Sequence, residues 1–195
     1  VTKDFAWRGF VVTAKFNEDL ARACKSSGCY EIASGIESGS PTILKSIRKP
    51  ATVDINRRFI RTAKRAGLRV KCFFIIGLKN ESWKTIMETD RFLESLKAEG
   101  CAPDDVDFSL LQIYKGAPLY SDPGDIIFKR DWSEKSYYKS SPSAYEELVQ
   151  VHTAAMSEKD LLAARSYLEE KWKPAGWVKD NTDRKDLDRV YENIR

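Results

Sequence analysis

Strand-like and helix-like patterns alternate through about the first 120 residues, and this alternation most constrains the fold. The clearest strand ends in the run CFFII, residues 72–76, which is apolar without alternation, as in a parallel strand buried on both faces. Strands separated by helices build parallel sheets through right-handed crossovers. We therefore predict an α/β fold with helices on one face of four parallel, sequentially ordered strands: Phe10–Lys15, Cys29–Gly35, Val70–Ile76 and Val106–Ile113.

Three of the predicted helices begin at a polar capping residue and end at a glycine. The caps are Asn17, Thr52 and Ser82, and the corresponding stops are Gly28, Gly67 and Gly100. A further short helix has Pro41 in its first turn, where a missing N–H is tolerated.

The pattern changes after residue 122. A turn-rich, aromatic stretch containing Trp132, Tyr137 and Tyr138 is predicted to be a loop that packs the rest of the chain onto the sheet. Residues 144–172 are predicted to form one long helix, which would include His152, and residues 184–195 a terminal helix. The buried stripe of the long helix is expected at Leu148, Val151, Ala155, Leu162 and Tyr167. We therefore divide the chain into residues 1–122, the strand–helix part, and residues 123–195, a C-terminal extension of loop and helices.

Composition excludes several classes of protein. The net charge of +4 is small, and the Lys and Arg residues are spread along the chain, so the sequence gives no strong nucleic-acid signal. No apolar run approaches the roughly 18 residues of a membrane span, and no signal peptide is visible. The four cysteines form no CxxC pair and the chain has one histidine, which argues against a zinc site and for reduced thiols in the cytoplasm.

Small-residue turns follow three of the predicted strands. They begin at Gly35, Gly77 and Tyr114, and the first two carry a glutamate, Glu37 or Glu81. In parallel α/β sheets, ligands bind at the carboxyl ends of the strands. By itself, the stretch YEIASGIESGS favours Glu37 as an acid at the start of the next helix. The three turns together favour a ligand-binding role for Glu37.

The ordered series SSGCYEIASGIESGSPTILKSIRK, AKRAGLRVKCFFIIGLKNES and DFSLLQIYKGAPLY resembles the radical S-adenosylmethionine (SAM) enzymes. The resemblance covers roughly residues 18 to 120 and is greatest to the subgroup that often carries a cobalamin-binding domain. It implies that the chain holds strands 3 to 6 of a partial parallel (βα) barrel. The departures are Lys79-Asn80 in place of the usual Pro-Gly, and Lys115-Gly116-Ala117 in place of Pro-Gly-Thr.

The resemblance also implies a SAM site at the strand ends. Glu37, beside Gly35, would accept hydrogen bonds from the ribose hydroxyls or the amino group of SAM. The strand end formed by Ile75, Ile76, Gly77 and Leu78 would pack on the adenine, and backbone groups of Ile113 and Tyr114 would meet its edge. Glu81 matches a glutamate that braces its turn.

The family's chemistry needs a [4Fe-4S] cluster held by cysteines spaced CxxxCxxC, and this spacing is absent. We expect those ligands upstream of residue 1, in a longer parent enzyme that cleaves SAM to a 5′-deoxyadenosyl radical and has cobalamin as a potential second cofactor. This chain alone is expected to be inactive, and its small-molecule substrate is not specified.

Three alternatives stay open: a non-catalytic α/β binding or assembly module, a nucleic-acid-modifying enzyme of the same superfamily, and a degenerate relative that lost the cluster. The exposed barrel edge could also mediate association.

Overall fold

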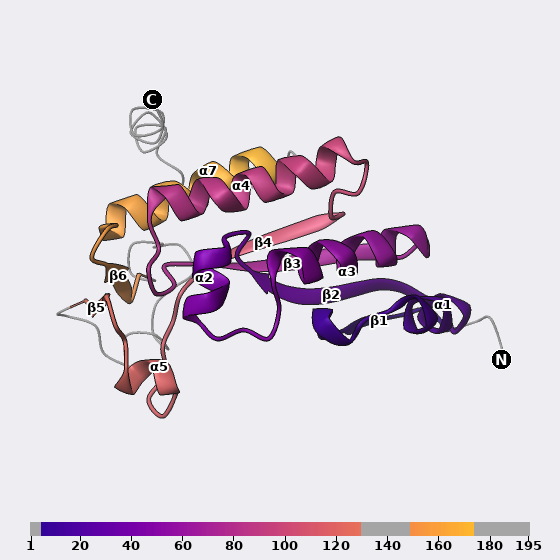
Figure 1. Cartoon of the computed structure of the whole chain (residues 1–195), viewed down its shortest axis with the longest axis horizontal. Helices are drawn as coiled ribbons and strands as arrows, with labels where there is room; N and C mark the ends of the chain where they lie inside the picture. Colours follow the sequence, from indigo (N-terminus) through magenta and orange to yellow (C-terminus); the bar gives the residue numbers. More distant parts are fainter. Residues whose placement is uncertain (1–4, 130–148, 174–195) are drawn as a thin grey trace. The chain divides into compact units, whose positions relative to one another are not determined.

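The computed structural model describes residues 5–129 and 149–173, which form two compact units (Figure 1). Among the described residues, the first unit comprises 5–74 and 88–107, and the second comprises 75–87, 108–129 and 149–173. In chain order the elements are β1 (Trp7–Phe10), the 3₁₀ helix η1 (Thr13–Lys15), α1 (Glu18–Ser26), β2 (Cys29–Glu37), α2 (Pro41–Ser46), α3 (Val53–Arg65), β3 (Arg69–Ile76), α4 (Trp83–Ala98), β4 (Asp105–Leu110), α5 (Pro118–Ser121), β5 (Ile126–Phe128), β6 (Val151–Thr153) and α7 (Glu158–Trp172).

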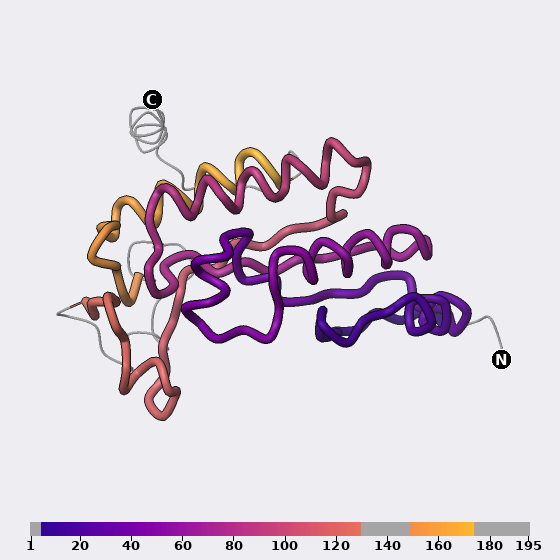
Figure 2. Tube along the Cα trace, in the orientation of Figure 1, coloured from indigo at the N-terminus to yellow at the C-terminus, as the bar shows by residue number. Residues whose placement is uncertain are grey.

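A four-stranded sheet with the order β1-β2-β3-β4 confirms the predicted α/β class and the sequential strand order. The pairs β1/β2 and β2/β3 are parallel, with Phe10 opposite Ala33 and Ser34 opposite Cys72. The Cα trace in Figure 2 follows the chain from β1 through η1 and α1 to β2, through α2 and α3 to β3, and through α4 to β4. Within the described residues the sheet is open, with β1 and β4 at its edges.

The first predicted strand was placed wrongly. The strand is Trp7–Phe10, and Thr13–Lys15 form a 3₁₀ helix in which the Lys15 N–H donates to the Val12 carbonyl over 3.0 Å. This turn brings Phe16, only 3% exposed, into edge-on contact with Phe59 of α3, with ring centroids 5.3 Å apart. Burial of Phe16 therefore outweighs the strand preference of the two preceding valines.

The third predicted strand is confirmed as β3, but the expected burial of both its faces is wrong. Val70, Cys72, Phe74 and Ile76 are buried, whereas the alternating residues Lys71, Phe73 and Ile75 are half-buried. On this second face, Lys71 makes a 2.7 Å ion pair with Asp105. The other strands also differ at their ends, since β2 continues to Glu37 and β4 stops at Leu110.

Local signals placed the helices well. Asn17 and Thr52 accept hydrogen bonds from the N–H groups of Leu20 and Ile55, over 2.9 and 3.2 Å, as N-caps should. The three predicted stop glycines, Gly28, Gly67 and Gly100, have positive φ values of 90°, 71° and 67°. In the first unit, α3 contacts both α1 and η1 (Figure 1).

The prediction of one long helix over residues 144–172 is wrong in its middle part. Residues Val151–Thr153 form β6, which pairs antiparallel with β5 and places His152 opposite Ile127. Helix α7 begins only at Glu158, because Ser157 and Asp160 form a capping box.

The predicted buried stripe of that helix is correct only in part. Val151 and Tyr167 are buried, but Ala155 is exposed and Leu162 is half-buried, and Leu161 and Leu168 are buried in α7 instead. Leu148, Trp132, Tyr137, Tyr138 and the predicted helix 184–195 lie outside the described residues. In the described ranges, no helix is both long enough and apolar enough to cross a bilayer.

Candidate ligand site at the strand ends

The end of β2 has an irregular backbone. A shift in the β2/β3 register between Gly35 and Glu37 marks a bulge, and Glu37 has a positive φ of 64°. The Ile36 carbonyl accepts hydrogen bonds from the Ser38 N–H over 2.9 Å and from Nδ2 of Asn56 over 3.3 Å. Asn56 is a fully buried residue of α3, so a helix of the same unit holds the bulge in place. A non-glycine residue with positive φ is uncommon and often occurs at functional sites.

The carboxylate of Glu37 accepts a hydrogen bond from Lys49 Nζ over 2.6 Å. Both side chains are about one-fifth exposed, at 20% and 21%. The Glu37 carboxylate lies over Gly35, where a Cβ atom would collide with Oε1. Among the described residues, the hydrogen-bond partner of this carboxylate is thus a lysine and not the backbone N–H groups of α2, which the helix-acid interpretation requires.

The end of β3 is a tight turn held by a buried carboxylate. Gly77 has a φ of 94°, and its N–H donates to Oε2 of Glu81 over 3.3 Å. The Thr85 hydroxyl donates to Oε1 of Glu81 over 2.6 Å, and the Thr153 hydroxyl donates to the Glu81 carbonyl over 2.9 Å. Glu81 is 1% exposed, and its burial raises its carboxyl pKa from 4.5 to about 7 despite these hydrogen bonds. Glu81 therefore braces the turn, as the resemblance implied.

The substitution of Lys79-Asn80 for Pro-Gly has a structural explanation. Asn80 has a φ of 67°, in the left-handed region that suits glycine and that asparagine tolerates better than most residues. Its N–H donates to the Asp125 carboxylate over 2.9 Å, and Lys79 lies 4.0 Å from the Asp122 carboxylate. Both residues thus interact within the second unit.

The segment after β4 is closed by a side chain from a distant part of the sequence. The Ile113 N–H donates to Oε1 of Gln150, and Nε2 of Gln150 donates to the Ile113 carbonyl over 2.9 Å. Ile113 and Gln150 are each 2% exposed, whereas Tyr114 is 50% exposed. The backbone groups of Ile113 therefore already have a carboxamide partner, and a ligand edge would have to displace Gln150 to reach them.

The predicted ligand residues are divided between the two units. Gly35 and Glu37 lie together in the first unit, and Ile75, Gly77, Leu78, Ile113 and Tyr114 lie in the second. Of the latter, Leu78 is 4% exposed and Ile75 is half-buried.

Three further residues at these strand ends were not predicted from the sequence: Lys49, Asn56 and Gln150. Asn56 carried a detectable signal, since it is a polar residue within the apolar stripe of α3. Lys49 and Gln150 carried no such signal, because their contacts span 12 and 37 residues of sequence.

Comparisons with known proteins agree with the fold. Residues 5–93 match the Radical SAM superfamily. An uncharacterized methyltransferase of Pyrococcus horikoshii is 31% identical over 131 residues, which are 66% of this chain and 28% of that protein. This part of the chain therefore matches the radical SAM superfamily, in agreement with the resemblance of the motif series.

Two solved structures resemble almost the whole chain. The archaeal Elp3 of Methanocaldococcus infernus has a TM-score of 0.60 at 14% sequence identity. The matched region covers 97% of this chain and 41% of the Elp3 chain. The cobalamin-dependent S-adenosylmethionine radical enzyme OxsB has a TM-score of 0.58 at 12% sequence identity. The matched region covers 97% of this chain and 33% of the OxsB chain. At such identities the likeness shows the fold alone. The chain spans less than a third of the methyltransferase and less than half of either solved chain.

The superfamily implies SAM and a [4Fe-4S] cluster, but the cysteines of this chain do not suit the cluster. Among the described residues, no group of three or more His, Cys, Asp or Glu side chains is placed to hold a metal. Cys24, Cys29, Cys72 and Cys101 are free thiols, and full burial raises the pKa of Cys72, which disfavours the thiolate that a metal needs. The strand-end groups, in contrast, are of the kind that SAM needs: a partly exposed carboxylate, an ammonium and apolar side chains.

Proposed function

We propose that this chain is the SAM-binding part of a radical SAM enzyme whose longer parent cleaves SAM to a 5′-deoxyadenosyl radical. The observation that carries this proposal is the geometry of Glu37. Its carboxylate stands on a positive-φ residue at the end of a parallel strand, lies over a glycine and meets a lysine instead of the helix N–H groups. This is a costly arrangement for an ordinary helix acid and a useful one for a carboxylate that must face a ligand.

In the proposed site, Glu37 accepts hydrogen bonds from the ribose hydroxyls or the amino group of SAM. A carboxylate has two oxygens and accepts several hydrogen bonds, so Oε1 can keep Lys49 while Oε2 receives a ligand donor. Lys49 Nζ has further N–H donors and limits the rotation of the Glu37 side chain. Asn56 acts as a positioning residue, because it fixes the carbonyl that precedes Glu37.

Within the second unit, the strand ends are those that the resemblance assigns to the adenine. Ile75 supplies partly exposed apolar surface next to the buried Leu78. Gly77 has no side chain, so a flat ring could approach its backbone on a side other than the one where Leu161 Cδ1 lies 3.2 Å from the position of a Cβ atom. Backbone groups of Ile113 and of Tyr114, a residue that is 50% exposed, would meet the adenine edge, those of Ile113 once Gln150 has moved.

When bound in the parent, the cluster would supply the electron that cleaves SAM. Its ligands would lie outside this chain, which we propose has no such activity alone. We also propose cobalamin as a cofactor of the parent, since the motif series is that of the subgroup that often binds it. The four free thiols support a cytoplasmic location.

The test is calorimetric titration of SAM into the reconstituted parent enzyme and its Glu37→Gln variant. Loss of one charge-assisted hydrogen bond should weaken SAM binding by about 1.5–3 kcal/mol, or roughly 10- to 100-fold. The control is Glu31→Gln, the same chemical change near the opposite end of β2, where Glu31 pairs with Arg8 and Arg69 at 3.7 and 3.6 Å.

We expect Glu31→Gln to leave SAM affinity within about twofold of wild type, whatever it does to stability, because Glu31 is remote from the carboxyl end of the strand. Equal SAM affinities of wild type and Glu37→Gln would refute the assignment of Glu37. Equal weakening by both variants would show that the effect is structural and would refute it too.

A further inference from the structure

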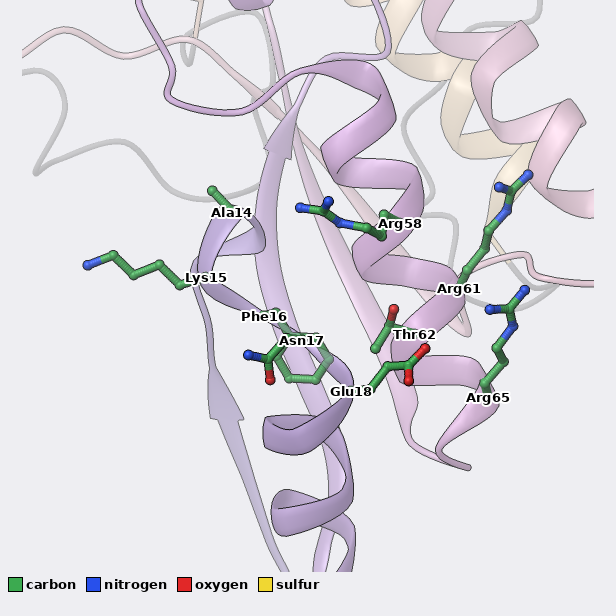
Figure 3. A pocket seen from close by; sticks show the side chains of 9 residues that line it. All are labelled: Ala14, Lys15, Phe16, Asn17, Glu18, Arg58, Arg61, Thr62 and Arg65. Carbon is green, nitrogen blue, oxygen red and sulfur yellow. The ribbon is translucent and has the colours of Figure 1, made fainter.

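A pocket of about 610 Å³ lies in the first unit, between the segment 14–18 and helix α3 (Figure 3). On one side are the backbone and side chains that run from η1 into the first turn of α1, and on the other are four side chains of α3: Arg58, Arg61, Thr62 and Arg65. Figure 3 shows Arg58 extending from α3 toward η1, and Glu18 pointing from α1 toward α3. The volume is within the range of about 300–1,000 Å³ that small-molecule sites occupy.

Arg58, Arg61 and Arg65 lie on successive turns of α3. They are separated by three and four residues, so their positions are neighbours along about 10 Å of helix. Figure 3 shows the Arg58 side chain turned toward η1, whereas those of Arg61 and Arg65 extend to the other side of the helix. Like charges at this spacing repel one another and destabilise a helix that has no counter-charge.

The chain neutralises only some of the cations of α3. The Glu99 carboxylate forms ion pairs with Arg57 and Arg61, at 3.1 and 2.6 Å. The Asp104 carboxylate forms an ion pair with Lys64 at 2.9 Å. Among the described residues, neither Arg58 nor Arg65 makes an ion pair, and both are exposed. Two of the arginines that line the pocket, Arg58 and Arg65, therefore have no counter-charge within the described part of the chain.

The remaining charges at this pocket leave a positive balance. Lys15 of η1 is exposed and makes no ion pair within the described part of the chain. Asp19 forms an ion pair with Arg22 of its own helix and so does not neutralise a cation of α3. Among the described residues that line the pocket, Glu18 is the one carboxylate, against four cations, of which Arg61 is already paired with Glu99.

We propose that this pocket binds a small ligand that carries two or more phosphate groups and hydroxyl groups, such as a nucleoside polyphosphate. Arginine presents a planar fork of N–H donors that matches phosphate oxygens, and Arg58 and Arg65 can hold separate phosphates along the helix. The hydroxyl of Thr62, a residue that is 8% exposed, and the Asn17 amide nitrogen can donate further hydrogen bonds. Glu18 accepts hydrogen bonds and so suits the hydroxyl groups of the ligand. This site is independent of the proposed SAM site.

The experiment titrates inorganic triphosphate into the purified protein at low and at physiological ionic strength. We compare wild type with Arg58→Gln/Arg65→Gln and with Lys84→Gln/Arg91→Gln. The second pair is matched, since it removes two exposed cations seven residues apart on α4. Wild type should bind saturably, the α3 pair should weaken binding at least about tenfold, and the α4 pair should leave it within about twofold. The double variant Arg58→Lys/Arg65→Lys keeps both positive charges but lacks the planar guanidinium donors. It should preserve the fold and bind triphosphate with an intermediate affinity.

Thermal unfolding supplies a second measurement. Triphosphate should raise the Tm of wild type and of the α4 pair, and not that of the α3 pair. Absence of saturable binding, or equal weakening by the two glutamine pairs, would overturn the proposal. It would also be overturned if an oligoglutamate peptide bound as tightly as triphosphate, or if a short single-stranded RNA bound and triphosphate did not.

Discussion

The buried carboxylate of Glu81 should make the stability of this protein depend on pH in an unusual direction. The folded pKa is about 7 against 4.5 for the free group, because burial disfavours the charged form. The folded state therefore binds this proton more tightly than the unfolded state. The contribution of Glu81 to the free energy of unfolding is largest below about pH 4.5 and is lost as the pH rises through 7.

The full amplitude of this effect is about 3 kcal/mol, and most of it falls between pH 5 and pH 8. Glu81→Gln should abolish it, because an amide does not titrate. Glutamine can keep both contacts, with its oxygen facing the Gly77 N–H and its nitrogen donating to the Thr85 hydroxyl oxygen. That hydroxyl can still donate to the Ser82 carbonyl, 2.8 Å away, so neither side chain loses a partner.

Urea unfolding of wild type and Glu81→Gln at several pH values between 5 and 8 measures the difference directly. The variant should gain stability relative to wild type as the pH rises, by about 2–3 kcal/mol over this range. Glu170→Gln, an exposed change on α7, should track wild type at every pH. A constant difference between wild type and Glu81→Gln across the pH range would refute the argument that burial shifts this group.

Further predictions concern packing, capping and metal content. Gly39→Ala should cost about 1–3 kcal/mol, because its Cβ would lie 2.6 Å from Cβ of Phe92 and 2.7 Å from Cα of Thr89. Phe59→Ala should cost about 3–5 kcal/mol, since this ring is 0% exposed. Ser157→Ala should cost about 1 kcal/mol through loss of the α7 capping box. Urea unfolding checks these three, and values near zero would contradict them. Anaerobically reconstituted chain should contain no iron, and stoichiometric iron with matching visible absorbance would contradict that prediction.

The amino-acid sequence was sufficient for the features that depend on short stretches of chain. The apolar run of β3 and the alternation with helices indicated a parallel sheet in sequential order, which β1-β2-β3-β4 confirms. Asn17 and Thr52 could be recognised as caps because a cap bonds to an N–H three residues away. The motif series by itself likewise indicated the superfamily, since each motif is a contiguous stretch of sequence.

Only the tertiary structure decided the features that depend on distant partners. Residues 13–15 turn away from the sheet because Phe16 packs on Phe59, and residues 151–153 form a strand because β5, about 25 residues earlier, provides hydrogen-bond partners. The same holds for the strand ends, where Lys49 donates a hydrogen bond to Glu37 and the Gln150 carboxamide bonds to both backbone groups of Ile113. Periodicity reports what a segment can bury, whereas these contacts depend on which groups the folded chain brings within hydrogen-bonding distance, and no short window of sequence contains both partners.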